Sequence, residues 1–240
     1  MDHVAIVTGG TRGIGRAICE ELHAAGAKVA ANYGGNDEAA ARFTAETGIK
    51  AYKFDVSDYD ACREGVARIA ADLGSVDILV NNAGITRDAT IMKMSRADWD
   101  AVIDTNLGSC FNMVHAVWDG MCARNFGRIV NIGSINGQGG QYGQVNYAAA
   151  KSGIHGFTKA LAQEGARYHI TVNALAPGYV DTDMVAAVPE RVLEKIIQNI
   201  PMRRLGKAHD IARGVVFLCG EDADFITGST MSINGGQHMY

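Results

Sequence analysis

The chain is poor in the features that mark many specialised classes of protein. It has only 3 prolines among 240 residues, and no proline- or serine-rich stretch divides it. No apolar run approaches the roughly 18 residues of a membrane-spanning helix. The segment from Met1 to Thr8 lacks the basic and apolar regions of a signal peptide. Since 48% of the residues are apolar, enough for a sizeable core, we expect one domain in a soluble, reducing compartment, the cytoplasm.

The chain also lacks a large excess of charge of one sign, and its cysteines are not arranged in pairs. The formal net charge is −4 and no block of like charges occurs, which excludes a surface built for nucleic acid or an anionic membrane. The 5 cysteines are dispersed without any Cys-x-x-Cys pair, so the sequence predicts neither a disulfide framework nor a metal site. Most of them fall within predicted helices, where we expect small buried side chains.

Strand and helix patterns alternate along the chain. Short apolar runs predict strands at residues 4–7, 27–31, 51–54, 78–80, 128–132, 170–175 and 229–233. Helical spacing predicts helices from residue 14 to the glycine at 26, at 39–47 and 59–73, and from about 98, 147 and 210. The early strands are almost continuously apolar, as strands are when both faces of a sheet are covered. We therefore expect one α/β domain over residues 1–240, folded as a doubly wound parallel sheet of the Rossmann type.

A glycine-rich turn joins the first predicted strand to the first predicted helix. Gly9, Gly13 and Gly15 let the backbone turn tightly and approach a pyrophosphate, and the helix N-terminus offers N–H groups without partners. The spacing departs from the Gly-x-Gly-x-x-Gly dinucleotide pattern, so a glycine-rich turn without a ligand stays open. The placement between strand and helix favours a dinucleotide site.

The end of the second predicted strand bears on the choice of dinucleotide. NAD enzymes usually place an acidic residue there for the adenosine ribose, whereas this chain has Asn32 and no acid before Asp37. Arg12 in the glycine-rich turn can bind a 2′-phosphate, which favours NADP over NAD, unless it pairs with a surface carboxylate. Asp55, directly after the third strand, is placed either for the adenine ring or as the cap of a turn.

Tyr147 and Lys151 are four residues apart, so on a helix the phenol and the ammonium share one face. A free tyrosine has a pKa of about 10 and exchanges protons poorly near neutrality. A cation within about 4–6 Å lowers that pKa, which is what a tyrosine acid/base requires. Because Tyr-x-x-x-Lys also occurs by chance in surface helices, the pattern needs support elsewhere; Ser134 lies thirteen residues upstream of Tyr147.

Several motifs occur in order along nearly the whole chain: Thr8-Gly-x-x-x-Gly-Ile-Gly15, Asp55, Asn81-Asn-Ala-Gly84, Asn106, Ser134, Tyr147-x-x-x-Lys151 and Pro177-Gly178. Together they resemble the short-chain dehydrogenase/reductase family. Further runs at 82–88, 95–107, 136–138, 146–151, 155–157 and 233–239 resemble its branch that reduces 3-oxoacyl thioesters, most of all acetoacetyl-CoA for polyhydroxyalkanoate synthesis. The resemblance implies a homotetramer that reduces such a CoA thioester with NADPH to the (R)-3-hydroxyacyl product.

The resemblance also implies a role for each motif residue. Tyr147 would give a proton to the substrate carbonyl oxygen, Lys151 would hold the nicotinamide ribose and lower the pKa of Tyr147, and Ser134 would hydrogen-bond the same oxygen. Asn106 would hold a water that links Lys151 to solvent, and Thr182 would grip the nicotinamide carboxamide. Contacts with the cofactor are implied for Gly9, Thr11, Arg12, Gly13, Ile14, Gly15, Asn32, Asp55, Val56, Asn82, Ala83, Gly84, Tyr147, Lys151, Pro177, Gly178, Val180 and Thr182.

The substrate is expected beside the segments that follow the fourth, fifth and sixth strands. Contacts with the acyl chain and the pantetheine arm are implied for Asp88, Ser134, Gln141, Tyr142, Gln144, Tyr147 and Tyr179. The glycine-rich stretch 137–144 could equally be an ordinary mobile surface loop. Residues 183–205 carry an apolar stripe at helical spacing and resemble the family's helical substrate lid, although a packed interface helix is compatible with the same pattern.

Other functions stay open. Acyl carrier protein shares the phosphopantetheine arm with CoA, so a 3-oxoacyl-[acyl-carrier-protein] reductase of fatty-acid synthesis is the near rival. Reductases of that kind present two arginines beside the cleft; Arg128 matches one, but Tyr168 stands at the second, with Arg167 adjacent. A non-catalytic nucleotide-sensing protein is a remote alternative because Tyr147 and Lys151 are both present. An alcohol or sugar dehydrogenase with a wider substrate range is also open.

Overall fold

The computed structural model describes residues 1–182 and 190–239. In that part of the chain one sheet of seven parallel strands has the order β3-β2-β1-β4-β5-β6-β7. Its strands are β1 (Val4–Val7), β2 (Lys28–Tyr33), β3 (Lys50–Lys53), β4 (Val76–Asn81), β5 (Gly127–Ile132), β6 (Ile170–Pro177) and β7 (Thr230–Ile233). The chain begins at β1, winds outward to β3, returns to β4 beside β1 and winds outward again to β7. The doubly wound α/β fold predicted from the sequence is confirmed.

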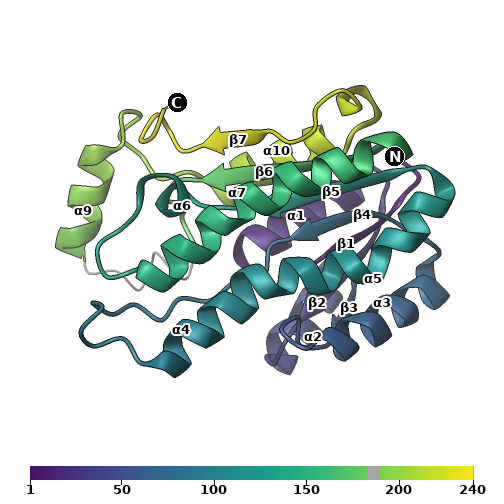
Figure 1. Cartoon of the computed structure of the whole chain (residues 1–240), viewed down its shortest axis with the longest axis horizontal. Coiled ribbons are helices and arrows are strands. Elements are labelled where there is room, and N and C mark those ends of the chain that lie inside the picture. Colours follow the sequence, from purple (N-terminus) through teal and green to yellow (C-terminus); the bar gives the residue numbers. More distant parts are fainter. Residues whose placement is uncertain (183–189, 240) are drawn as a thin grey trace.

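Helices cover both faces of the sheet (Figure 1). One face carries α1 (Gly13–Ala24), α2 (Asp37–Thr47) and α10 (Ala208–Cys219). The other carries α3 (Tyr59–Leu73), α5 (Ser109–Arg124) and α7 (Val145–Gly165). Three shorter helices, α4 (Arg96–Ile103), α6 (Ile135–Gly139) and α9 (Glu190–Asn199), lie on the side to which the arrows of β4, β6 and β7 point (Figure 1).

The apolar strands are continuous because both of their faces are buried. Every residue of β1, β5 and β6 is buried. Ile18, Leu22 and Phe43 fill the core on the α1 face, and Ile69 and Met113 fill it on the α3 face. Covered parallel strands need apolar residues on both sides, which is why their sequences do not alternate.

The carboxyl ends of β1 and β4 lie side by side at the point where the winding direction reverses. Val7 at the end of β1 pairs with Ala31 of β2 on one side and with Val80 of β4 on the other. The connection after β1 turns toward one face and the connection after β4 toward the other, which opens a crevice in sheets of this kind. The predicted nucleotide motifs therefore fall at the position where such sheets bind ligands.

Several helices begin with a side-chain cap that α1 lacks. Asn36, Asp58 and Ser95 each accept a hydrogen bond from a backbone N–H in the first turn of α2, α3 and α4. Arg12 precedes α1 in an extended conformation and its side chain caps no N–H group. The first turn of α1 thus keeps its donors for another acceptor.

The structure refines the sequence-based expectation in several details. The helix at 59–73 matches α3 at both ends, but the helix expected from about 98 begins at Arg96, and a π-helical turn, Asp104–Gly108, separates α4 from α5. Part of the stretch expected as a loop is helix α6, because Gly137 packs where a Cβ would lie 2.6 Å from the backbone carbon of Lys151. Within the expected lid, α9 is helical, and residues 183–189 lie outside the described residues.

Candidate active site

The turn between β1 and α1 leaves no room for side chains at two of its glycines. Gly9 has a φ of 62°, and a Cβ on Gly15 would lie 2.1 Å from the Gly9 carbonyl oxygen. Asn82 closes the turn from β4 by donating from Nδ2 to the carbonyl oxygens of Thr8 (2.8 Å) and Gly9 (3.3 Å). Within the described residues no acceptor pairs with the N–H groups of residues 13–15, at the start of α1. A glycine turn with unpaired donors fits the diphosphate of a nicotinamide dinucleotide.

The segment after β6 returns over this turn. A Cβ on Gly13 would lie 3.8 Å from Cγ2 of Thr182, so the side chain of Thr182 faces the glycine turn. Pro177 ends β6, and Gly178 donates its N–H to the Ile233 carbonyl oxygen at 2.9 Å. Val180 is buried beyond it. The structure therefore brings together the first and the last of the segments predicted to contact the cofactor.

Asn32 lies beside the same turn, with its side chain directed into the protein. It is 1% exposed; Oδ1 accepts from the Gly9 N–H at 3.3 Å and Nδ2 donates to the Phe54 carbonyl oxygen at 2.8 Å. The next acid along the chain, Asp37, accepts from Lys53 Nζ (2.8 Å) and from the Tyr33 hydroxyl (3.0 Å). The hydrogen bond from Lys53 lowers the pKa of Asp37. The end of β2 therefore presents a neutral amide and a carboxylate already paired with a cation.

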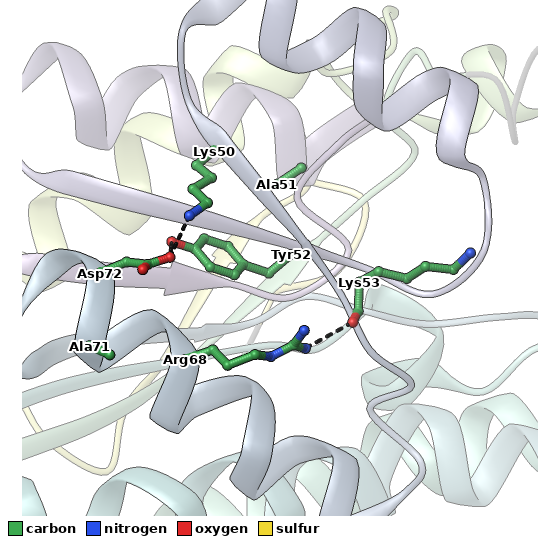
Figure 2. A pocket seen from close by; sticks show the side chains of 7 residues that line it. All are labelled: Lys50, Ala51, Tyr52, Lys53, Arg68, Ala71 and Asp72. Atoms are coloured by element: carbon green, nitrogen blue, oxygen red, sulfur yellow. Dashed lines mark hydrogen bonds and ion pairs between the residues drawn. The ribbon is translucent and has the colours of Figure 1, made fainter.

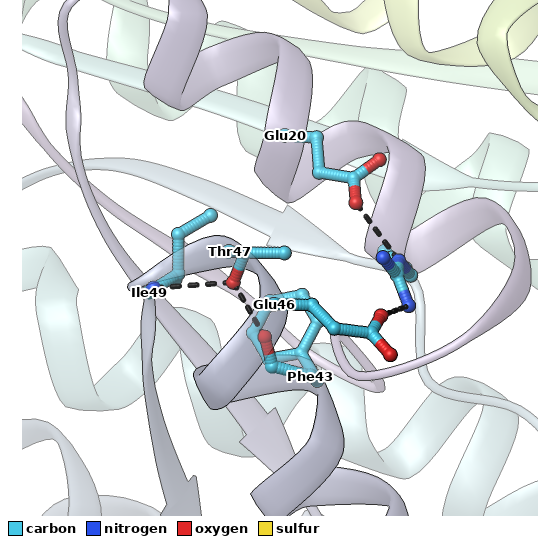
Figure 3. A network of polar contacts seen from close by, with 6 residues as sticks. Glu20, Phe43, Glu46, Thr47 and Ile49 are labelled. Carbon is cyan, nitrogen blue, oxygen red and sulfur yellow. Dashed lines mark hydrogen bonds and ion pairs between the residues drawn. The ribbon is translucent and has the colours of Figure 1, made fainter.

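Arg12 differs from the arginine one turn further along α1. Arg16 donates from Nε to Glu20 (2.8 Å) and from Nη1 to Glu46 (2.7 Å), which ties α1 to α2 (Figure 3). Arg12 is exposed, and its guanidinium has no hydrogen-bond or ion-pair partner in the described part of the chain. Pairing of Arg12 with a surface carboxylate, the alternative left open by the sequence, is not found among those residues.

Asp55 and Val56 follow β3. Asp55 is exposed, and its Oδ1 accepts from both the N–H (2.9 Å) and the hydroxyl (2.7 Å) of Ser57, as in a turn cap. Val56 is buried, and its carbonyl oxygen accepts from Asn112 Nδ2 at 3.0 Å. These contacts fix the turn where the adenine ring is expected, so the cap and the adenine contact are compatible.

Ser134 and Tyr147 meet beyond the carboxyl end of β5. Ser134 is 8% exposed and caps α6, its Oγ accepting from the Asn136 N–H at 3.1 Å. Tyr147 is half-buried in the first turn of α7 and hydrogen-bonds Ser134. Burial raises the pKa of Tyr147, the bond to Ser134 lowers it, and the nearby Asp88 carboxylate and Tyr179 phenol raise it; the net shift is upward. Tyr147 is therefore protonated at neutral pH.

Lys151 lies on the same helix face but is bonded elsewhere. It is 4% exposed, Nζ donates to the Ile132 carbonyl oxygen at 2.7 Å, and Nζ lies 5.8 Å from the centroid of the Tyr147 ring. Burial lowers the pKa of Lys151 to about 8. We expected this cation to lower the pKa of Tyr147. In the structure that pKa is raised instead, because desolvation of the phenol is the largest effect.

Asn106 joins this group from the π-helical turn. It is 1% exposed; Oδ1 accepts from the Ile85 N–H (2.8 Å) and Nδ2 donates to the Ile85 carbonyl oxygen (2.9 Å). A Cβ on Gly84 would lie 3.2 Å from Asn106 Oδ1 and 3.7 Å from Lys151 Nζ. Gly84, Asn106 and Lys151 thus converge, and π-helical turns are frequent at functional sites. A water held by Asn106 can use its main chain, the second N–H of Nδ2 or the remaining lone pair of Oδ1.

Of the residues expected to contact the substrate, Asp88 and Gln144 are joined by a hydrogen bond, whereas Gln141 and Tyr142 are exposed. Gln144 donates from Nε2 to Asp88 (2.8 Å) and accepts at Oε1 from Asn136 Nδ2 (2.9 Å), so the segments after β4 and β5 are joined. Gln141 and Tyr142 are exposed, Tyr142 by 86%. Tyr179 is half-buried and lines a hollow near the end of β7. The other residues that line it are Ile200, Met202, Arg204, Gly206, Asp210, Ile233, Asn234 and Gly235.

Known proteins match the chain over its whole length. Residues 9–238 match the family model described as Enoyl-(Acyl carrier protein) reductase, adh_short_C2. Acetoacetyl-CoA reductase of Rhizobium meliloti is 65% identical over 240 residues, all of both chains. The chain belongs to the short-chain dehydrogenase/reductase family. Acetoacetyl-CoA reductase of Cupriavidus necator is 48% identical and 3-oxoacyl-[acyl-carrier-protein] reductase of Haemophilus influenzae 44%, each over 98% of both chains.

Membership of the short-chain dehydrogenase/reductase family makes the chain a nicotinamide-dependent oxidoreductase. The resemblance stated from the sequence motifs is confirmed. The description of the family model names reduction of an enoyl thioester, whereas the full-length relatives above are named for 3-oxoacyl reduction, so the substrate must be tested directly.

Three polar residues of the site escaped the sequence-based assignment. Thr8 is 2% exposed, and its Oγ1 accepts from the N–H groups of Asn82 and Ala83, both at 2.9 Å. Asn136 holds Gln144, as described above. Asn146 is fully buried and donates from Nδ2 to the Arg87 carbonyl oxygen at 3.0 Å. Thr8 and Asn146 belong to recognised motifs but were given no role, because their partners are distant in sequence and no local pattern indicates those contacts.

The position of Arg128 differs from its expected place beside the cleft. It is 4% exposed, is the second residue of β5, near the amino end of the strand, and donates from Nη1 to the carbonyl oxygens of Gly127 (3.0 Å) and His169 (3.2 Å). Its guanidinium stacks 4.5 Å above the centroid of the Phe126 ring. In the described chain Arg128 is therefore a buried structural cation at the end of the sheet opposite the site. It offers no surface for a carrier protein there.

A second hollow lies at the free edge of β3 (Figure 2). Lys50 and Tyr52 both point to Asp72, the Tyr52 hydroxyl donating at 2.9 Å, and Arg68 donates to the Lys53 carbonyl oxygen at 3.1 Å. Charged side chains along an edge strand discourage pairing with another chain. We assign this hollow to edge protection, remote from the active site. None of the described helices is long and apolar enough to cross a membrane.

Proposed function

We propose that the chain reduces a 3-oxoacyl-CoA thioester, acetoacetyl-CoA, to the (R)-3-hydroxyacyl-CoA with NADPH, and so supplies polyhydroxybutyrate synthesis. The observation that carries the proposal is the Ser134–Tyr147 pair on the same edge of the sheet as the glycine turn, with Tyr147 protonated at neutral pH. A protonated phenol in that position can act as the acid of a carbonyl reduction. The full-length relatives named for acetoacetyl-CoA reduction support the choice of substrate.

The hydroxyls of Ser134 and Tyr147 have different roles at the carbonyl oxygen of the substrate. When bound, the reduced nicotinamide supplies a hydride to the carbonyl carbon. Ser134 donates a hydrogen bond to the carbonyl oxygen as negative charge develops on it. Tyr147 transfers its phenolic proton to the same oxygen, so one hydride and one proton convert the ketone into the alcohol. The phenolate left on Tyr147 then has to be reprotonated.

Lys151 is suited to return the proton. Its pKa of about 8 lets the ammonium release a proton near neutral pH, which an exposed lysine does poorly. The ammonium lies on the same helix face as Tyr147, and Gly84 and Asn106 converge beside it. We propose that Asn106 holds the water that resupplies Lys151 from solvent, and that Lys151 also holds the nicotinamide ribose.

The end of β2 supports NADPH over NADH. Asn32 is turned inward, Asp37 is paired with Lys53, and the exposed Arg12 has no partner among the described residues. A neutral strand end would leave the ribose hydroxyls of NADH without a carboxylate acceptor, whereas a free guanidinium can bind a 2′-phosphate. Gly13 and Thr182, which face each other, would then both contact the bound nucleotide.

The position of Arg128 favours CoA over acyl carrier protein as the carrier of the acyl group. CoA and acyl carrier protein present the same arm to the ordered pair of Asp88 and Gln144. The buried position of Arg128 removes one of the two arginines expected for carrier docking, which favours CoA. A carrier-protein reductase remains the second candidate because a relative of that name is 44% identical over nearly the full length.

The deciding experiment follows NADPH oxidation at 340 nm by purified protein. Acetoacetyl-CoA, acetoacetyl-carrier protein and crotonyl-CoA are compared at matched concentrations, with chiral analysis of the product. We expect the highest kcat/KM on acetoacetyl-CoA, with the (R)-alcohol as product. A higher kcat/KM on the carrier-bound ester would assign the chain to fatty-acid elongation. Activity on crotonyl-CoA alone would replace the proposed 3-oxoacyl reduction by enoyl reduction.

We propose a homotetramer as the assembly. The support is the family resemblance in the last residues, 233–239, with exposed apolar side chains such as Phe111 (53%), Val145 (44%) and Met239 (75%). Sizing with light scattering checks the assembly, and a monomeric mass at micromolar concentration would exclude it.

A further inference from the structure

A chain of buried polar side chains crosses the interior below the active site. Asn81 Nδ2 donates to Asn131 Oδ1 at 2.8 Å, and Asn131 Nδ2 donates to Thr158 Oγ1 at 3.0 Å. The three residues are 4%, 0% and 1% exposed. They come from β4, β5 and α7, and Asn81 and Asn131 face each other in register. The buried polar chain (Asn81, Asn131, Thr158) is thus a directional link from β4 to the helix that carries Tyr147 and Lys151.

Stability alone is a poor reason for these residues. Their surroundings are the apolar core between the sheet, α5 and α7, where polar groups are favourable only when all their hydrogen bonds are made. Asn81 Oδ1 is buried and has no hydrogen-bond partner among the described residues. Replacing an incompletely satisfied buried network by apolar side chains is often neutral or stabilising. The buried polar chain therefore serves the placement of its elements.

The element that it places is α7. The sheet-facing side of this helix carries Lys151, Ile154, Thr158 and Ala162, at helical spacing. Apolar contacts such as those of Ile154 and Ala162 are not directional and resist sliding along the helix axis only weakly. Two polar contacts are directional, and they reach successive residues of β5: Thr158 bonds Asn131, and Lys151 bonds the carbonyl oxygen of Ile132.

The end of the β4–β5 ladder explains why Lys151 finds an acceptor there. The last register pair of β4 and β5 is Asn81 with Asn131. Ile132 pairs with Leu175 of β6 but has no register partner in β4. The carbonyl oxygen of Ile132 accepts from Lys151, one residue after Asn131, which the buried polar chain holds to Thr158.

We infer that Asn81, Asn131 and Thr158 are positioning residues that set the height of α7 on the sheet and thereby hold Lys151 against the Ile132 carbonyl oxygen, in place for proton return to Tyr147. The consequence for the reaction rests on the proposed function, whereas the placement of Lys151 does not. Cys110 and His155 are the other titratable side chains whose pKa values respond to the charge of Lys151.

The test compares three variants of the full chain with the wild-type protein. Thr158→Val removes the acceptor of Asn131 and keeps the shape of the side chain, and Thr158→Ser restores the hydroxyl. Thr171→Val is the matched control, because Thr171 is a buried threonine of β6 (4% exposed) whose hydroxyl has no hydrogen-bond partner among the described residues. Thr158→Ala serves in place of Thr158→Val if the latter does not fold.

Two readouts are taken on each variant. One is the pH profile of kcat with acetoacetyl-CoA and NADPH. The other is the titration of Lys151 by NMR of ¹³C-lysine protein, its signal assigned by its loss in Lys151→Arg, which needs no activity. For Thr158→Val we expect kcat to fall about tenfold or more, on the scale of a misplaced proton-transfer group. We also expect the titration of Lys151 to move to lower pH, because the ammonium loses its carbonyl acceptor.

Thr158→Ser and Thr171→Val should keep both wild-type values. Wild-type kcat together with an unmoved Lys151 titration in Thr158→Val would overturn the inference. So would an equal effect of Thr171→Val, which would indicate a general disturbance of the core, or a loss of kcat without any movement of Lys151. If the wild-type protein does not reduce acetoacetyl-CoA but the Lys151 titration moves only in Thr158→Val, the proposed function fails and the positioning role stands.

Discussion

Removing the hydroxyl of Tyr147 gives the sharpest test of the proposed chemistry. Tyr147→Phe keeps the ring in the first turn of α7 and deletes the proton donor and its hydrogen bond with Ser134. General acid catalysis by a positioned side chain contributes about 10²–10⁴-fold. The expected loss of kcat is therefore of that size, which corresponds to roughly 2.7–5.4 kcal/mol of transition-state stabilisation.

Binding and stability should change far less than turnover. The ring of Tyr147 stays in place, so the Kd of NADPH, followed by its fluorescence, should stay within about threefold, less than the tenfold that 1.4 kcal/mol gives. One hydrogen bond to Ser134 is lost, worth about 1 kcal/mol of unfolding free energy. For a chain of this size that corresponds to a Tm shift of about 2–4 °C.

Tyr59→Phe is the matched control for this experiment. Tyr59 also has a hydroxyl in one side-chain hydrogen bond, to His115 Nδ1 at 2.9 Å, but it lies at the start of α3, outside the candidate site. It should lose a similar amount of stability and keep its kcat. Retention of more than about 5% of the wild-type kcat by Tyr147→Phe would refute the assignment of the acid, given the size of acid catalysis.

Three further predictions concern the cofactor turn and Lys151. Gly15→Ala forces a Cβ to within 2.1 Å of the Gly9 carbonyl oxygen, so we expect loss of NADPH binding by calorimetry and a Tm lower by several degrees. Arg12→Gln should raise the KM for NADPH about tenfold or more and leave that for NADH unchanged, since a charge-assisted hydrogen bond is worth about 1.5–3 kcal/mol; Arg16→Gln, which removes a paired cation, should not discriminate between the two cofactors. Lys151 has a pKa of about 8 in the folded chain against 10.5 normally, so at this residue the unfolded state binds more protons between these values, and the contribution of Lys151 to stability should rise with pH across that window by up to about 3 kcal/mol. The buried cysteines, whose pKa values are raised in the folded chain, act in the opposite direction, so the quantity to measure is the difference in unfolding free energy between wild type and Lys151→Met. In denaturant titrations at pH 7, 9 and 10.5 that difference should shift in favour of wild type as pH rises; a difference that does not change with pH would show that Lys151 does not titrate in this window.

Local patterns in the sequence were sufficient for the fold and for naming the residues that are proposed to form the site. Apolar runs without alternation predicted covered parallel strands, and the helix predicted at 59–73 agrees with α3 at both ends, where Asp58 caps the first turn. Gly9, Asp55, Asn82, Ser134 and Pro177 were found because each follows or ends a strand, and the carboxyl ends of parallel strands share one edge of the sheet. The glycine turn was predicted for the same reason, since backbone freedom is a local property.

Properties that depend on desolvation or on distant partners were decided only by the tertiary structure. Lys151 was expected to lower the pKa of Tyr147, but burial raises the pKa of the phenol and lowers that of the ammonium. Arg128 was expected beside the cleft and is buried at the opposite end of β5. The π-helical turn at Asn106 depends on a pairing with Ile85, 21 residues away. Burial and pairing between distant segments exist only once the chain is packed, so no local pattern records them.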